Sequence, residues 1–191
     1  MIDSAINHIA SELNQYLKRG FDQSEDLVVV SNILEQDGTL STRVDNKIVV
    51  SLVNIEKDSV PFRRESPVSG ATQRAVVSAQ PVYFNLYLMF ASCFSSSNYK
   101  EGLKLISNTI GFFQEQPVLD RNNTPALDKK IDKLILEIEN LSMHDLSNLW
   151  GVLSGKYLPS IMYKVRMVTY DSAALRGQAA VLSQTRHTTG H

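Results

Sequence analysis

The sequence predicts an α/β fold of the α+β type, in which helices pack on a single mixed, mostly antiparallel sheet. Three segments have the three- and four-residue apolar spacing of amphipathic helices, and five extended runs separate or follow them. The order is helix, strand, strand, strand, helix, strand, helix, strand, which gives one sheet with flanking helices. The 191 residues suit one domain, predicted over residues 1–171, and a C-terminal tail, residues 172–191, where the apolar pattern fades.

The first third of the chain contains one helix and two strands. Apolar residues on one face predict a helix over residues 2–19, which Gly20 ends. Short runs rich in β-branched residues predict strands over residues 27–32 and 47–55. Residues 57–79 contain two prolines and have no sustained apolar period, so they predict a long loop. This loop carries three arginines, Arg63, Arg64 and Arg74.

The middle of the chain predicts the centre of the sheet. Residues 81–94 are apolar on both faces, which is typical of a strand covered on both sides. Residues 95–98 offer N-cap side chains for a helix that ends before Pro117. Its predicted buried stripe consists of Tyr99, Leu103, Ile106, Ile110 and Phe113.

The last third predicts a loop, a strand, a short helix and a final strand. Residues 118–128 form the predicted loop. Residues 133–139 alternate between apolar and charged side chains, which predicts a strand with one solvent-exposed face. Ser142 begins the helix, with Asp145 placed as in a capping box. In the final strand, Tyr163, Val165, Met167 and Thr169 alternate with Lys164, Arg166 and Val168.

Composition argues against several functional classes. A net charge of −1 argues against a general nucleic-acid binder. The start of the chain has no basic and apolar leader pattern, and its longest apolar stretch is too short to insert in a membrane. The single cysteine, Cys93, fits a reducing compartment, so we expect a cytoplasmic protein.

No cluster of residues favours catalysis or metal binding. The segment from Gly151 to Tyr157 superficially resembles a phosphate-binding loop, but its glycine spacing is wrong and Tyr157 stands where a Ser or Thr would hold magnesium. The four histidines are scattered, and none forms a zinc pair. His8 lies beside the first helix's apolar stripe, which predicts a solvated or capping role. We therefore expect no cofactor, no metal site and no enzyme.

Charge and aromatic residues are unevenly distributed. Residues 1–56 carry nine acids and four bases, whereas residues 150–191 carry five bases and one acid. This is either chance scatter or complementarity between neighbouring copies of the chain. Residues 157–170 mix tyrosines with cationic side chains, as binding surfaces do. The alternative is an ordinary half-buried strand with a solvated face; as an edge strand, it could accept an arm from another subunit.

Several blocks in order make a family recognisable. They are the run from Leu153 to Asp171, the strand from Pro81 to Phe90, the helix end from Ile110 to Gln114, and the segment from Val53 to Lys57. Together they resemble the N-terminal domain of the cap, or tail-terminator, proteins of contractile injection systems of the antifeeding-prophage and virulence-cassette type.

The resemblance implies a tail-terminator-like fold and a structural role. It implies a homohexameric ring at the end of the needle farthest from the baseplate, which stops the inner tube protein from polymerising and anchors the last ring of sheath protein. The contact residues that we expect are Arg63, Arg64, Arg74, Lys156, Tyr157, Tyr163, Lys164 and Arg166. A free-standing protein-binding adaptor is the first alternative, and a small enzyme is a more distant one.

Overall fold

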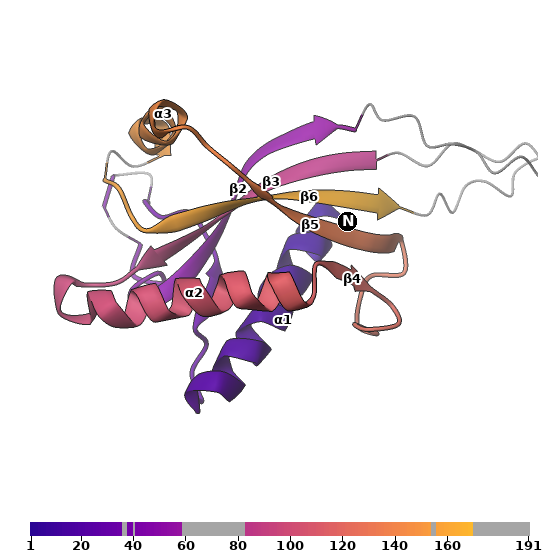
Figure 1. Cartoon of the computed structure of the whole chain (residues 1–191), viewed down its shortest axis with the longest axis horizontal. Coiled ribbons are helices and arrows are strands. Elements are labelled where there is room, and N and C mark those ends of the chain that lie inside the picture. The colour runs from indigo at the N-terminus through magenta and orange to yellow at the C-terminus, as the bar shows by residue number, and fades with distance from the viewer. Residues whose placement is uncertain (36–37, 40, 59–82, 154–155, 170–191) are drawn as a thin grey trace, which may run out of the picture.

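The fold is a six-stranded sheet with helices on both faces (Figure 1). The computed structural model describes residues 1–35, 38–39, 41–58, 83–153 and 156–169. The strand order is β1-β2-β3-β6-β5-β4, and only β1 and β2 pair in parallel. The strands are β1 (Val28–Val30), β2 (Lys47–Lys57), β3 (Tyr83–Cys93), β4 (Val118–Asp120), β5 (Ile131–Glu139) and β6 (Ser160–Thr169). The predicted mixed, mostly antiparallel sheet is confirmed.

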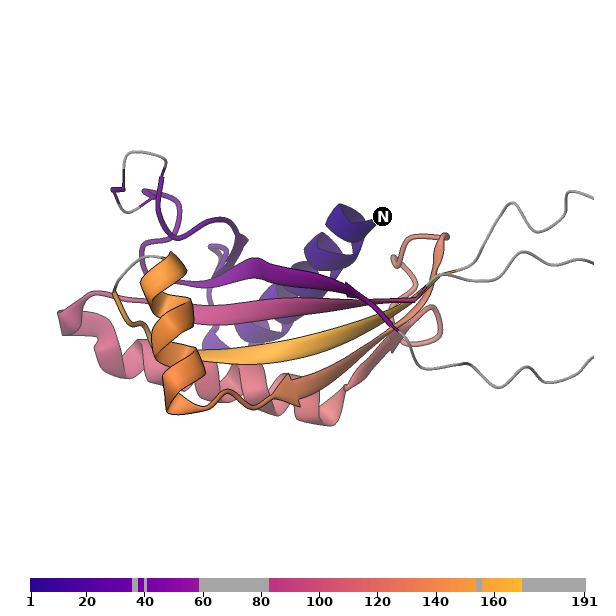
Figure 2. The same ribbon diagram turned by 90° about the horizontal axis from the view of Figure 1, so that it is seen from above.

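The helices are divided between the two faces of the sheet. α1 (Ile2–Phe21) and α2 (Tyr99–Glu115) cover one face, where they enclose the larger hydrophobic core. α3 (Met143–Leu153) packs on the other face over a smaller cluster around Trp150, Met89 and Met162. Figure 2 shows that α3 crosses only one end of the sheet, so no helix of the described residues lies on the rest of this second face.

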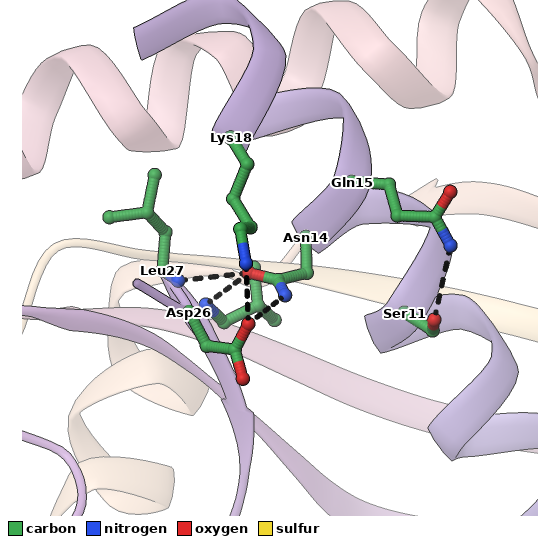
Figure 3. Close-up of polar contacts among 7 residues, drawn as sticks. Ser11, Asn14, Gln15, Lys18, Asp26 and Leu27 are labelled. Carbon is green, nitrogen blue, oxygen red and sulfur yellow. Dashed lines mark hydrogen bonds and ion pairs between the residues drawn. The ribbon is translucent and has the colours of Figure 1, made fainter. Parts of the chain in front are cut away.

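α1 is held against the sheet by polar contacts as well as by its apolar stripe (Figure 3). The side-chain oxygen of Asn14 accepts hydrogen bonds from the backbone N–H groups of Leu27, at 2.9 Å, and Val28, at 3.2 Å. Its amide nitrogen donates to Asp26 at 2.8 Å, and Lys18 forms an ion pair with the same carboxylate at 3.1 Å. Asn14 therefore fixes the start of β1 to the middle of α1.

α2 is rotated relative to the predicted stripe, of which Phe113 is buried and Ile106 is partly buried against the core. Its buried residues are Gly102, Leu105, Thr109, Phe112 and Phe113, whereas Tyr99 and Leu103 of the predicted stripe are exposed. The helix approaches β3 most closely at Gly102, where an added Cβ would collide with the hydroxyl of Ser92. Thr109 is tolerated in the core because its hydroxyl donates to Leu105 O at 2.9 Å. A close glycine contact therefore overrides the larger apolar residues in setting the helix rotation.

Two further local predictions are corrected. Residues 118–128 were predicted to be a loop, but they begin with β4, a strand of only three residues. Asp120 then forms a side-chain turn by accepting from the N–H groups of Asn122 and Asn123. His8 is buried rather than solvated or capping, and desolvation lowers its pKa against the opposing effect of Glu12.

Three ends of described segments, Asp58, Tyr83 and Thr169, lie at the end of the sheet opposite α3 (Figure 1). Tyr83 pairs with Val168, and the Asp58 N–H donates to Tyr83 O at 2.9 Å, so Asp58, Tyr83 and Thr169 are close together. Lys57 ends β2 and is not part of the predicted 57–79 loop. The rest of that loop from residue 59, and the predicted tail at 172–191, lie outside the described residues.

Candidate protein interface

The structure separates the predicted contact residues into distinct environments. Arg63, Arg64 and Arg74 lie outside the described residues. Lys156 and Tyr157 are exposed in the segment between α3 and β6. On β6 itself, Lys164 and Arg166 lie on the face that does not carry α1 and α2, and Tyr163 lies on the opposite face.

Tyr163 belongs to the core rather than to the surface. Its side chain is 2% exposed, and its ring packs edge-on against Phe90 at 5.5 Å and lies 5.0 Å from Phe113. Burial raises its pKa to about 12, and its hydroxyl has no hydrogen-bond partner among the described residues. Tyr163 as described is therefore out of reach of a docking partner.

β6 is a central strand, which excludes it as an acceptor of an added strand. It is paired along its length with β3 on one side and β5 on the other. In the described part of the chain, β1 pairs only with Ile48–Val50 of β2, and β4 pairs only with Lys133–Ile135 of β5. Among the described residues, the sheet therefore ends at the short strands β1 and β4, and beyond them the second halves of β2 and β5 also have no strand on their outer side.

We call the part of the second sheet face that α3 does not cross the open sheet face. It carries a polar row that crosses four strands, Asn54 on β2, Tyr87 on β3, Lys164 on β6 and Glu137 on β5, which are consecutive register partners. A second row contains Glu56, Asn85 and Arg166.

Glu56 and Tyr87 connect the two rows. The Tyr87 hydroxyl donates to Glu56 at 3.0 Å, and the Asn54 amide donates to the same carboxylate at 3.2 Å. Desolvation, and then Glu56, raise the pKa of Tyr87, so the phenol stays protonated and can donate. The open sheet face is therefore a preformed, hydrogen-bonded polar surface with charges of both signs.

The two cations of this face have different roles. Arg166 forms an ion pair with Asp58 at 2.9 Å, and the Asp58 side chain is only 7% exposed. Removing Arg166 would leave that carboxylate without its ion pair in a buried site, which is costly. Lys164 has no ion pair within 4 Å among the described residues, although it lies between Tyr87 and Glu137. Lys164 is thus the cation available to a partner.

A second surface is apolar and lies along one flank of α3. We call it the α3 groove; its lining residues are Met143, Leu146, Ser147, Trp150, Gly151 and Tyr157, around a volume of about 490 Å³. Met143 is 81% exposed and Tyr157 is 62% exposed, and the rings of Trp150 and Tyr157 contact edge-on at 5.9 Å. Trp150 itself is 3% exposed, and its indole N–H has no partner among the described residues. Such a groove suits an apolar protein segment.

Sequence reasoning found one half of this surface and missed the other. Tyr157 is among the predicted contact residues, but no residue of α3 is among them, and Leu146, Leu149, Trp150 and Leu153 of this helix pack in the smaller cluster. Met143 is placed beside Tyr157 by the turn of the chain after α3, and no periodic pattern reports that turn. The only available signal was that the helix has more apolar residues than one buried stripe needs.

No metal-binding group emerges from the described residues: no three His, Cys, Asp or Glu side chains gather in a way that could hold an ion. Nor is any helix within those residues sufficiently long and apolar to cross a bilayer. What the described surfaces offer is hydrogen bonding, charge and apolar contact.

Comparison with known protein families identifies the family of this chain. The sequence profile of the Pvc16 N-terminal domain matches residues 4–184. The chain belongs to this family. No curated protein matches the chain in sequence. The match to the Pvc16 N-terminal domain extends past the end of β6 at Thr169 and so includes most of the predicted tail.

Solved structures with the same fold belong to contractile injection systems. One is the sheath/tube terminator of an extracellular contractile injection system, PVC, in its extended state; it is 15% identical with a TM-score of 0.60. Another is the tube terminating cap of the anti-feeding prophage, which is 14% identical with a TM-score of 0.58. The matches cover 99% and 97% of this chain but 64% and 61% of those chains. This Pvc16-family chain thus spans less than two thirds of the length of either protein.

Proposed function

We propose that this chain is a structural cap of a contractile injection system. In the proposed role it forms a homohexameric ring that ends the inner tube and anchors the last sheath ring, at the end distal to the baseplate. The observation that carries the proposal is the Pvc16 N-terminal domain match together with a fold shared over nearly the whole chain with a sheath/tube terminator and a tube terminating cap. Residues 1–171 are the proposed terminator domain, and residues 172–191 are a separate tail.

The surface chemistry supports a binding role. A terminator must complement the growing end of a polymer on one side and fail to reproduce that end on the other. The open sheet face and the α3 groove are chemically different and lie on the same side of the sheet. One is polar and hydrogen-bonded, and the other is apolar, which gives the molecule two separate surfaces for unlike partners.

We keep a smaller set of candidate contact residues, chosen by their exposure and their ion pairs. Lys164 on the open sheet face, and Lys156 and Tyr157 beside α3, remain candidates, as do the three arginines outside the described residues. Arg166 acts through its ion pair with Asp58 and is proposed as a supporting residue. Cytoplasmic assembly is part of the proposal, and Cys93, a buried thiol whose pKa burial raises, suits a reducing compartment.

Imaging of native particles tests the proposal. The protein is tagged, labelled with gold and imaged by negative stain in particles purified from its own host. We expect label at one end only of sheathed needles, and six copies per particle by quantitative mass spectrometry against the tube protein. Label along the needle or at both ends contradicts a terminator. A protein that is a stable monomer and never copurifies with needles is instead the free-standing adaptor.

A further inference from the structure

The α3 groove is an apolar surface that no described segment covers. Met143 at one side and Tyr157 at the other are among the most exposed large apolar side chains of the described residues. Gly151 widens the groove, because a Cβ built there has no atom within 4 Å. The volume of about 490 Å³ lies within the range of about 300–1,000 Å³ that binding clefts have. A surface of this kind on an ordinary folded domain is typical of an interaction site.

The tail of the same chain carries a matching pattern. Leu175, Ala179 and Leu182 are spaced as i, i+4 and i+7, which would place them on one face of a helix of two turns. Gly177 falls on the opposite face of such a helix, where it would lower helix stability by about 1 kcal/mol relative to alanine. The family match ends at residue 184, just after this pattern, so the apolar part of the tail belongs to the matched domain.

The length of chain between Thr169 and Leu175 limits which groove the tail can enter, that of its own chain or that of another copy. α3 packs over Met162, which lies seven residues before the end of β6 at Thr169, or about 23 Å along the strand. α3 lies at the end of the sheet where β6 begins, away from the end of β6 at Thr169 (Figure 1), and the groove is lined by α3 and by Tyr157, which precedes β6. Leu175 follows Thr169 by six residues and extends at most about 22 Å from it. A tail helix therefore cannot place Leu175 in the groove of its own chain.

We propose that the tail of one copy docks as a short amphipathic helix into the α3 groove of a neighbouring copy. Leu175 and Leu182 fill the space between Met143 and Tyr157, above Trp150. This contact is head-to-tail, because the tail of each copy enters the groove of the next, and head-to-tail contacts form a ring when the rotation between copies closes. The inference adds a specific contact between subunits to the proposed ring. It rests on the proposed function only in requiring that copies of the chain associate.

The single tryptophan of the chain provides a direct measurement. Trp150 is buried beneath the groove and contacts the exposed ring of Tyr157, so its emission reports the polarity of the groove, which rises when the groove is uncovered. On dilution of the full-length protein without tube or sheath, we expect a red shift of the emission that coincides with dissociation seen by mass photometry. Leu175→Glu, Leu182→Glu and Met143→Glu should show the red-shifted emission at every concentration. Val152→Glu is the matched control, because Val152 is 85% exposed on the same helix but does not line the groove.

The substitution Gly177→Ala tests whether the docked tail is helical. If the tail docks as a helix, this change should tighten self-association by about fivefold, since it stabilises the helix on the face away from the groove. Unchanged or weakened association after Gly177→Ala overturns the helical form of the proposal.

Disulfide formation between two variants distinguishes docking of the tail into a neighbouring copy from docking into its own chain. Two separately purified variants, Met143→Cys and Leu182→Cys, are mixed and oxidised; a mixed disulfide dimer is expected, and Cys93 is buried and should not react. A Gly190→Cys partner, beyond the apolar pattern, is the control. If the emission of the parent protein does not change on dilution while the tail variants are red-shifted, the tail occupies its own groove and the proposal is wrong. If they change nothing while labelled rings still cap needles, the tail contact fails and the proposed function stands.

Discussion

At the scale of single residues, Tyr163 shows why side-chain type alone is a poor guide to an interface. Its place in a run that mixes tyrosines with cationic side chains made it a candidate contact, but strand alternation places it with Phe90 and Phe113 in the core. The buried hydroxyl then has no partner among the described residues, and leaving such a group unsatisfied costs about 1–3 kcal/mol. The aromatic contacts, rather than the hydroxyl, explain its place there.

Tyr163→Phe should therefore stabilise the protein, by about 1 kcal/mol, with no effect on assembly. Its pKa of about 12 lies above the ordinary value of 10, so between pH 10 and pH 12 the unfolded chain releases a proton that the folded chain retains. Stability from this group is complete below pH 10 and is lost as the pH rises through that window. Urea unfolding at pH 7, 10 and 11.5 should show a smaller decline for Tyr163→Phe. Tyr99→Phe, at an exposed site, should change neither quantity.

At the scale of elements, α2 demonstrates a conflict between helix propensity and packing. Gly102 is the point of closest approach to β3, whereas Gly111, two turns later in the same helix, has open space around it. Alanine is preferred over glycine in helices by about 1 kcal/mol. Where a Cβ would meet the buried hydroxyl of Ser92, that gain is outweighed by the strain of overpacking, typically about 1–3 kcal/mol.

The two substitutions should thus have opposite signs. Gly102→Ala is expected to lower the free energy of unfolding by about 1 kcal/mol or more, and Gly111→Ala to raise it by about 0.5–1 kcal/mol. Chemical denaturation of both variants under one set of conditions tests this. Two stabilising substitutions would mean that α2 moves easily away from Ser92.

The junction of α1 with β1 allows a second element-scale test. Asn14→Ala removes the acceptor of two backbone N–H groups, those of Leu27 and Val28, and the side-chain bond to Asp26. We expect a loss of about 1–3 kcal/mol and faster hydrogen exchange at Leu27 and Val28. Gln15→Ala, in the next position but turned to solvent, should stay within about 0.5 kcal/mol of the parent. Equal effects of the two changes would contradict the assigned role of Asn14.

Elements with strong periodicity were predicted well, and the failures have physical causes. α1, β2, β3, β5, α3 and β6 were all expected close to their observed bounds, because each buries a regular face. β4 was missed because three residues contain no measurable period. Alternation correctly placed Lys164 and Arg166 on one face, but the ion pair of Arg166 with Asp58, 108 residues away in sequence, depends on the sheet order. The α3 groove likewise depends on how the chain turns back from α3 to β6.

At the scale of the whole molecule, the proposed assembly depends on Lys164 rather than on the basic strand as a whole. Lys164→Glu should reduce ring assembly on tubes by at least tenfold if the open sheet face meets an acidic partner, without changing the fold. Lys100→Glu on α2, on the other side of the sheet, makes the same charge change and serves as the control. Sedimentation with purified tubes, with circular dichroism to check folding, measures both. Normal capping by Lys164→Glu would remove the open sheet face from the interface.

The hydrogen bond between Asp58 and Tyr83, with Thr169 beside it, also has a consequence for how sequences of this kind can change in length. Every addition between Asp58 and Tyr83, or after Thr169, enters at one end of the sheet and leaves the register of all six strands intact. The entropic cost of closing a longer connection grows only logarithmically with its length, by about 0.6 kcal/mol per doubling. Lineages can therefore gain or lose whole segments at this end, and so acquire new attachments, while the core that must fit its neighbours stays the same.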